Sequence, residues 1–424
     1  MRQFFKSISH NYSDLLILVL VFFLPFSIPY TNGAIILLII SSIVKIIDEK
    51  RMIVKLYWFL PVLFLYHFIS GIWSGASWSF LEKNLLFLAI PLFFAQHSNF
   101  HRVRISRIGL AFILGNVTAS LACLIKATIM SIGFTNQQIV FYPNVEPGAT
   151  EDFLNSSVMG GNYFFSDHFS FFIHPSYFGL YVAFAQSLVY FVVRSQEYKK
   201  WNYTLIGSYI FFIIIIFLLS SKAAIFSSIG LTSGIIYVWI KREGTWLLKI
   251  SSVIGVAIMA TLFVFYNPRL KAFKDTLSIS QFISPDPHAQ FGHDLRILSW
   301  NAAFEVIKNN WILGVGEGNK ETALTDVYMK RGYDFAGQQK FNSHNQYLDY
   351  FIGGGIFAFS LFLFGLAQLI FTSFKKNNKL LLVFLLIFSF NLLFENLLSR
   401  YWGILFFSIF VSLWSNRSSV QTTK

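Results

Sequence analysis

The stretch YTLIGSYIFFIIIIFLLS, residues 203–220, decides the fold class. It runs for eighteen residues without a charged side chain, and a helix of about 20 apolar residues crosses the hydrocarbon core of a bilayer. Over the whole chain 55% of the residues are hydrophobic and only 12% are charged, whereas soluble domains carry roughly 25% charged residues. The sequence therefore predicts an all-α integral membrane protein.

Similar apolar runs recur along the chain and predict about twelve transmembrane helices. They lie near 14–30, 33–47, 54–74, 80–96, 106–133, 168–193, 203–220, 222–240, 247–266, 346–374, 379–396 and 399–415. The first run is interpreted as a retained span because it lacks a small-residue cleavage site. We expect three regions: spans one to nine in 1–266, a partly helical outer loop in 267–345, and the last three spans with a tail in 346–424.

Lysine and arginine alternate between the two sides of these spans. With the N-terminus inside, the connections near 30–33 and 75–79 and the segment 134–167 lie outside and contain no Lys or Arg. Inner connections hold an excess of both residues, which is the rule for membrane orientation. This placement explains the net charge of +13, so nucleic acid is not an expected partner. We expect both termini in the cytoplasm and membrane lipid around the spans.

The segment 267–345 is the long outer loop, and long loops without secondary structure of their own are usually functional. Helical spacing predicts one helix over 294–310, with Asp294 as its N-cap, and another over 321–332. Ser343 is expected to cap the tenth span, which puts His344 in the first turn of that helix. A helix N-terminus keeps imidazole neutral and attracts anions, as a general base beside phosphate requires. From position alone, a polar anchor at the interface is the alternative.

The residues favour neither a metal nor a nucleotide site. Asp286, His288, His293 and Asp294 have no familiar metal-ligand spacing, and no Asp-x-Asp pair or phosphate loop occurs. A single cysteine, Cys123, excludes an internal disulfide and a cysteine metal cluster. No metal and no cofactor is therefore expected.

Several short motifs occur in a specific order along the chain. They are His174-Pro175-Ser176-Tyr177, Ser220-Ser221-Lys222, Arg296-x-x-x-Trp300, Gly314-Val315-Gly316-Glu317-Gly318, His344-Asn345 followed after nine residues by Gly355, and Phe394-Glu395-Asn396-Leu397-Leu398. Together with the loop before the last three spans, this order resembles the O-antigen ligase and polymerase superfamily, with a composition similar to members from the Bacteroidetes. The resemblance covers most of the chain.

This resemblance implies a glycosyltransferase in the bacterial inner membrane with a periplasmic active site. Its donor would be a glycan on undecaprenyl diphosphate, transferred with inversion and without a metal. A ligase passes the glycan to lipid A–core, and a repeat-unit polymerase passes it to another lipid-linked glycan. A flippase or transporter is a further alternative, although the chain shows no internal repeat of the kind that transporters carry.

The resemblance also assigns expected roles to individual residues. His344 would accept the proton of the acceptor hydroxyl, and Arg296 would pair with the donor diphosphate, since guanidinium binds phosphate through two parallel hydrogen bonds. Glu395 would orient His344 or the acceptor, or else pair with Arg400. The expected substrate contacts are Lys222, Arg269, Asn345, His174 and Trp300. A solvated arginine, a lysine at the interface and a helix-start histidine are the structural alternatives for Arg296, Lys222 and His174.

Overall fold

A computed structural model of the chain describes residues 14–49, 58–96, 105–135, 138–146, 161–243, 245–267, 270, 285–289 and 292–415. These residues are mostly helical, as expected for an all-α membrane protein. Seven helices in this part of the chain are long and apolar enough to cross a membrane: Trp78–Gln96, Ile105–Ser131, Pro175–Arg194, Lys199–Leu219, Lys222–Lys241, Lys249–Tyr266 and Gln346–Lys375. Shorter apolar helices occupy the other five expected spans. The count of twelve spans therefore stays a prediction.

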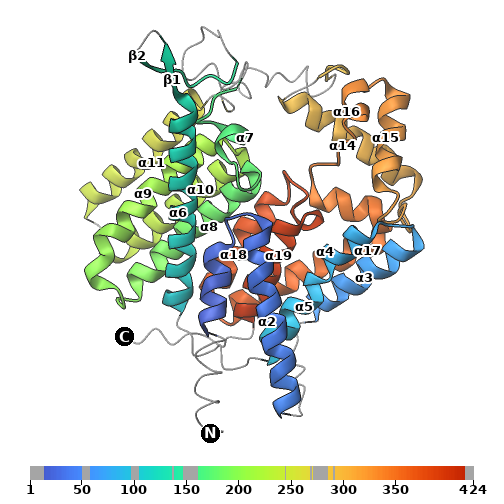
Figure 1. Cartoon of the computed structure of the whole chain (residues 1–424), viewed down its shortest axis with the longest axis horizontal. Helices are drawn as coiled ribbons and strands as arrows, with labels where there is room; N and C mark the ends of the chain where they lie inside the picture. Colours follow the sequence, from blue (N-terminus) through green and yellow to red (C-terminus); the bar gives the residue numbers. More distant parts are fainter. Residues whose placement is uncertain are drawn as a thin grey trace. The chain divides into compact units, whose positions relative to one another are not determined.

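The chain divides into two compact units, and the first comprises residues 1–35 and 103–275. Its described elements are an initial helix Asp14–Phe23, α6 (Ile105–Ser131), β1 (Ile132–Thr135), β2 (Gln138–Phe141), α7 (Ser166–Phe169), α8 (Pro175–Arg194), η3 (Lys199–Trp201), α9 (Asn202–Leu219), α10 (Lys222–Glu243) and α11 (Trp246–Tyr266). The two strands pair antiparallel, with Ile132 opposite Phe141. Helix α8 packs against α6, α9 and α10 (Figure 1).

Helix α8 is the centre of this first unit, and it begins later than the expected span 168–193. His174 is its N-cap and Pro175 its first residue. A proline fits this position because its missing N–H would have no helical partner there. Residues from Pro175 to Val192 are buried over most of their length. Gly179 lets α10 approach, because a Cβ there would lie 2.7 Å from the Cβ of Ala224.

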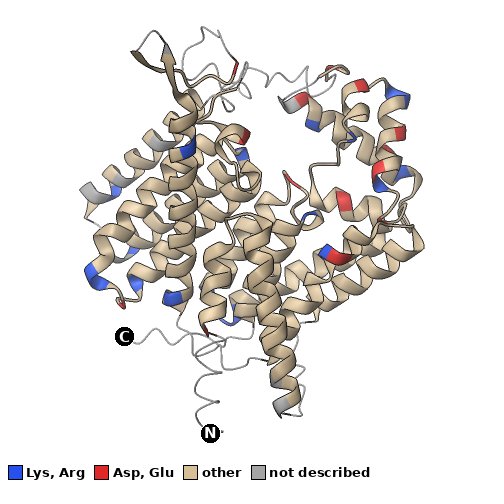
Figure 2. Cartoon of the chain, viewed as in Figure 1, with Lys and Arg blue, Asp and Glu red and all other residues tan. Residues whose placement is uncertain are grey.

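The second unit comprises residues 36–102 and 276–424. Helix α2 (Ile28–Glu49) begins in the first unit's range and ends in the second's. The other elements are α3 (Phe59–Trp73), α4 (Trp78–Asn84), α5 (Leu86–Gln96), α14 (Gly292–Asn309), α15 (Lys320–Arg331), α16 (Asp334–Gln338), α17 (Gln346–Lys375), α18 (Lys379–Asn391), η4 (Leu397–Ser399) and α19 (Tyr401–Ser415). Helix α17 packs on α3 and α18, and α19 packs on α5. Figure 2 shows that charged residues are sparse along α17 to α19 and gather in α14 to α16.

Two expected helix caps were wrong. Helix α14 begins at Gly292, so Asp294 lies inside its first turn instead of capping it. The tenth expected span, α17, is capped by Asn345, whose side-chain oxygen accepts hydrogen bonds from the backbone N–H groups of Tyr347 and Leu348. Ser343 and Asn345 are both good capping residues, so the sequence alone could not choose between them.

Candidate active site

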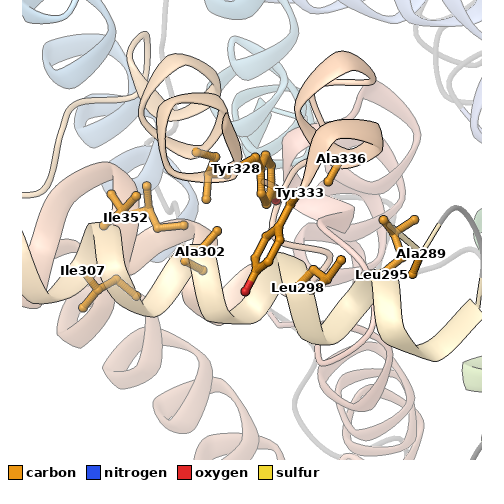
Figure 3. Close-up of a cluster of buried hydrophobic side chains, with 12 residues drawn as sticks. Ala289, Leu295, Leu298, Ala302, Ile307, Tyr328, Tyr333, Ala336 and Ile352 are labelled. Atoms are coloured by element: carbon orange, nitrogen blue, oxygen red, sulfur yellow. The ribbon is translucent and has the colours of Figure 1, made fainter. Parts of the chain in front are cut away.

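Helix α14 is oriented by its apolar face. Leu298 and Ala302 are buried against Tyr328 of α15 and Ile352 of α17 (Figure 3). Full burial of one leucine side chain contributes about 1.5–3 kcal/mol, so packing sets which side of the helix faces the core. Arg296 lies beside this apolar face and is half-buried. Its direction is thus a consequence of how α14 packs.

The motif glycine Gly355 has a structural requirement of its own. Helix α17 is broken there, with φ and ψ of 60° and −155° at Gly355. This positive φ disfavours side chains, and a Cβ would lie 2.1 Å from the backbone oxygen of Ile312. Gly314 of the glycine turn also lies close to α17, because a Cβ there would lie 2.6 Å from the backbone carbonyl carbon of Gly353. Glycines in the glycine turn and in α17 therefore allow the backbones of these two segments to come into contact.

Three backbone hydrogen bonds join the glycine turn to the break in α17. They run from Val315 N to Ile352 O at 2.8 Å, from Gly316 N to Gly353 O at 2.9 Å, and from Ile356 N to Trp311 O at 2.8 Å. The break in α17 leaves these backbone groups without partners inside the helix, and buried backbone groups need hydrogen-bond partners. The turn 311–318, which connects α14 to α15, is consequently fastened to α17.

His344 lies immediately before α17 rather than inside its first turn, which corrects the sequence-based expectation. Its φ is 45°, in the left-handed region, and its backbone N–H donates to Oδ1 of Asn342 at 2.9 Å. Asn345 then caps the helix. Non-glycine residues in this region are uncommon, and strained backbone of this kind is concentrated at functional sites. The histidine is still at the mouth of α17.

The three residues expected to act in catalysis lie together. Arg296 Nη2 is 3.8 Å from Oε1 of Glu395, and His344 Nδ1 is 3.5 Å from Oε2 of the same carboxylate. The side chains are 25%, 15% and 22% exposed for Arg296, Glu395 and His344. Glu395 thus faces both residues, while Arg400, its alternative partner, is exposed. Arg296 comes from α14, Glu395 from the turn after α18, and His344 from the segment before α17.

A second cluster of charged residues lies deeper, around Glu317 of the glycine turn. Lys320 Nζ is 2.7 Å from Oε2 of Glu317 and 2.6 Å from Oδ2 of Asp349 in α17. The hydroxyl of Tyr66 in α3 donates to Glu317 Oε1 at 2.8 Å, and His67 Nδ1 lies 3.6 Å from the same oxygen. The Glu317 side chain is fully buried. This cluster holds the glycine turn and the start of α15 against α3 and α17.

Asp349 also ties the His344 segment to the Glu395 segment. Its carboxylate accepts from Asn396 Nδ2 at 3.0 Å and from Ser399 Oγ at 2.9 Å. Gln346 adds a further link, because its side-chain oxygen accepts from the backbone N–H of Leu398 at 2.6 Å. The first turn of α17, which follows His344, is therefore hydrogen-bonded to the residues that follow Glu395. These bonds limit how far the two catalytic candidates can separate.

Glu317 and Lys320 keep their charges because each compensates the other. Burial alone would raise the pKa of the Glu317 carboxyl, but Lys320 and His67 outweigh burial and hold that pKa well below its usual range. Burial would likewise lower the pKa of the Lys320 amino group, yet Asp349 and Glu317 raise it above its ordinary value. Both groups are accordingly ionised near neutral pH.

Sequence reasoning missed Lys320 and Asp349 as members of the site. A signal was present for Asp349, which lies inside the expected span 346–374, because ionisable residues in transmembrane segments are rare and mark functional sites by default. Lys320 offered no such signal, since it is one of nine basic residues in the loop 267–345. Only the tertiary structure shows that it is buried between two carboxylates.

A protein-family model described as O-antigen ligase matches residues 207–363. These residues are similar to an O-antigen ligase domain. This match confirms the superfamily that the sequence motifs resemble, and it supports a membrane enzyme of the O-antigen ligase or polymerase type. Such enzymes imply a lipid-linked glycan and a glycan acceptor as substrates. No curated protein matches the chain.

The O-antigen ligase match ends before one of the three catalytic candidates. It includes Arg296, the glycine turn, His344 and Gly355, whereas Glu395 lies beyond residue 363. The assignment of Glu395 to the site therefore rests on its distances to Arg296 and His344. Lys320 and Asp349 fall inside the matched segment.

Three of the expected substrate contacts belong to the first unit. Lys222 is the first residue of α10. His174 has a structural role as N-cap of α8, where its Nδ1 accepts from the backbone N–H of Ser176 at 3.3 Å, and its Nε2 lies 3.6 Å from Asp167. Arg269 lies outside the described residues. The contribution of these residues to substrate binding stays a prediction.

The remaining two expected contacts, Asn345 and Trp300, lie in the second unit. Asn345 uses its side-chain oxygen to cap α17. Trp300 is half-buried one turn after Arg296 in α14, and its buried indole nitrogen has no hydrogen-bond partner in the part of the chain that the structure describes. Within those same residues, no group of three His, Cys, Asp or Glu side chains is placed to hold a metal ion.

Proposed function

We propose that the protein is an O-antigen ligase-like glycosyltransferase at the periplasmic face of the bacterial inner membrane. It moves a glycan from undecaprenyl diphosphate to an acceptor sugar on lipid A–core. The observation that carries this proposal is the grouping of Arg296, Glu395 and His344 at the mouth of α17. An acid–base residue and a phosphate-binding cation are the two groups that this transfer needs.

The chemistry assigns a separate task to each residue. The acceptor hydroxyl oxygen attacks the anomeric carbon, and His344 takes the hydroxyl proton. The bond from that carbon to the phosphate oxygen breaks on the opposite side, so the configuration inverts. Undecaprenyl diphosphate leaves with the electron pair, and Arg296 pairs with its oxygens. No metal takes part, and the proton passes from His344 to solvent.

Glu395 acts as the residue that positions His344. We assign the ring proton to Nδ1, the nitrogen that lies 3.5 Å from the carboxylate, which leaves the lone pair on Nε2 to accept the proton of the acceptor hydroxyl. A carboxylate in this position fixes the tautomer and favours the imidazolium that forms during the reaction. Its second oxygen faces Arg296 and holds the guanidinium near the site of bond breakage.

A repeat-unit polymerase of the same superfamily is the alternative. The segment 134–167 contains no Lys or Arg, so it offers no cations for a second lipid diphosphate, which favours the ligase. Deletion of the gene in the native bacterium tests this choice. We expect long glycan chains to accumulate on undecaprenyl diphosphate. Accumulation of single repeat units would instead identify a polymerase, and an unchanged glycan profile would reject both.

Complementation of this deletion strain tests the residue roles. His344→Ala should abolish glycan attachment while the protein still inserts in the membrane. His288→Ala is the matched control, because His288 is also in the outer loop and its side chain is 75% exposed. Wild-type lipopolysaccharide ladders in the His344→Ala strain would reject His344 as the base.

Arg296→Lys tests the phosphate contact. Lysine keeps the charge but loses the planar pair of donors, so we expect severe loss of glycan attachment. Arg331→Lys is the control in the same loop, where Arg331 pairs with Glu305 instead. Full activity of Arg296→Lys would make Arg296 a surface residue with no specific contact.

A further inference from the structure

Two cations of the second unit, Lys83 and Arg400, border the same peptide and have no assigned role. Lys83 of α4 is half-buried, and its Nζ donates to the backbone oxygen of Ser399 at 2.7 Å. It also lies over the ring of Phe80, 5.1 Å from the centroid. Arg400 is the next residue after Ser399 and is exposed. Lys83 therefore contacts the residue that precedes Arg400, at the turn before α19.

Neither cation is neutralised by a carboxylate. Among the described residues, no Asp or Glu forms an ion pair with Lys83 or Arg400. The carboxylates of Asp349 and Glu317 interact electrostatically with Lys83, but both form ion pairs with Lys320 Nζ, at 2.6 and 2.7 Å respectively. A carbonyl acceptor and an aromatic ring stabilise an ammonium group without cancelling its charge.

The carboxylates around the site pair with other cations. Among the described residues, Lys320 is paired with Glu317 and Asp349, and Arg296 faces Glu395. In the part of the chain that the structure describes, Lys83 and Arg400 form no such pair, and Glu82, which precedes Lys83, is exposed. An anion bound at Lys83 and Arg400 would balance their charges.

The location of the two cations indicates where that anion comes from. Lys83 lies near the outer end of the expected span 80–96, and Arg400 near the outer end of the expected span 399–415. Basic residues are depleted on this side of membrane proteins, and those that occur within spans usually mark a ligand path. Lys83 is also turned toward protein, to Ser399, whereas a lysine that serves only as an anchor extends into the aqueous interface.

We propose that Lys83 and Arg400 bind a phosphate group carried by a lipid at the outer membrane surface, at a site separate from Arg296. Arg400 supplies the planar fork that matches two phosphate oxygens, and Lys83 supplies a compact charge beside it. The outer-face position rests on the proposed function. Phosphate binding itself does not, because it can be measured without glycan transfer.

The test uses the purified full-length chain in detergent and two probes. The first probe is farnesyl diphosphate, which carries the lipid diphosphate of a lipid-linked substrate. The second is short-chain phosphatidylglycerol, which carries the headgroup of an ordinary membrane lipid. Binding is followed by microscale thermophoresis in the Arg296→Gln background, which removes the proposed donor contact, with and without the double substitution Lys83→Gln/Arg400→Gln. Lys308→Gln/Lys340→Gln removes the same net charge from the outer loop and serves as the matched control.

Loss of one charge-assisted contact weakens binding roughly tenfold to hundredfold, so the double variant, which loses two, should bind more weakly by a factor on the order of a hundred or more. Loss confined to farnesyl diphosphate identifies a lipid-linked substrate as the ligand, and loss confined to phosphatidylglycerol identifies a membrane phospholipid. Unchanged affinity for both probes, or an equal loss in the control variant, would overturn the proposal.

One further variant and a comparison of binding with transfer separate this site from misfolding and from the proposed function. Lys83→Arg/Arg400→Lys keeps both charges and should retain most of the affinity, so its failure to bind would also count against a phosphate site. The wild type should bind both probes whether or not it transfers a glycan. Binding without glycan transfer would leave the phosphate site standing while the proposed function fails.

Discussion

Lys320→Met removes the one cation that lies between two buried carboxylates. Lys320 contacts Glu317 at 2.7 Å and Asp349 at 2.6 Å, and its own side chain is 13% exposed. Methionine has a similar length and no charge, so it fills the space without compensating either carboxylate. The variant therefore isolates the electrostatic role of the amino group.

The expected loss is about 3–5 kcal/mol of unfolding free energy, the usual cost of removing one partner from a buried ion pair. Lys330→Met provides the control on the same helix, because Lys330 pairs with Glu305 at 3.2 Å with a side chain that is 75% exposed. Exposed pairs contribute at most about 1 kcal/mol. Glu305 also keeps Arg331 as a partner.

Reversible unfolding in mixed dodecyl sulfate and nonionic detergent micelles measures both variants. The triple variant Glu317→Gln/Lys320→Met/Asp349→Asn should recover part of the loss, since it leaves no unpaired buried charge. Equal losses for Lys320→Met and Lys330→Met, or a loss below about 1 kcal/mol for Lys320→Met, would refute the reasoning that buried charge compensation holds the glycine turn and the start of α15 to α3 and α17.

Three other predictions follow from the same structure. Gly355→Ala should prevent correct folding, because its Cβ would lie 2.1 Å from Ile312 O, and the monodisperse peak in size-exclusion chromatography should be lost. Gly234→Ala is the control and should keep the peak, because a Cβ there meets nothing within 4 Å. Identical behaviour of the two variants would contradict the close approach of Gly355 to Ile312. The contribution of the Glu317 and Lys320 charges to the stability of the wild type should be constant from about pH 5 to pH 10. It should shrink as the pH falls through the lowered pKa of Glu317 or rises through the raised pKa of Lys320, and a titration centred near neutral pH would contradict this assignment. A reporter fused after residue 300 should read as extracytoplasmic, and a cytoplasmic reading would reject both the topology and the mechanism.

The apolar runs and the order of short motifs allowed the helical class and the superfamily to be predicted from the sequence. Hydrophobic length is a local property, so runs such as 203–220 predict a helix without knowledge of the neighbours. Helix ends were less predictable. The cap of α17 is Asn345 and not Ser343, because two neighbouring residues with the same capping chemistry compete and the surrounding contacts decide.

The sequence by itself determined which residue types are available for catalysis: one histidine and one arginine in the loop motifs, and one glutamate before the last span. Only the tertiary structure decided that Glu395 faces both Arg296 and His344, and that Lys320 is buried between Glu317 and Asp349. The physical reason is sequence distance. These contacts join residues of α14, the glycine turn, α17 and the turn after α18, and their separation depends on helix packing that no local pattern encodes.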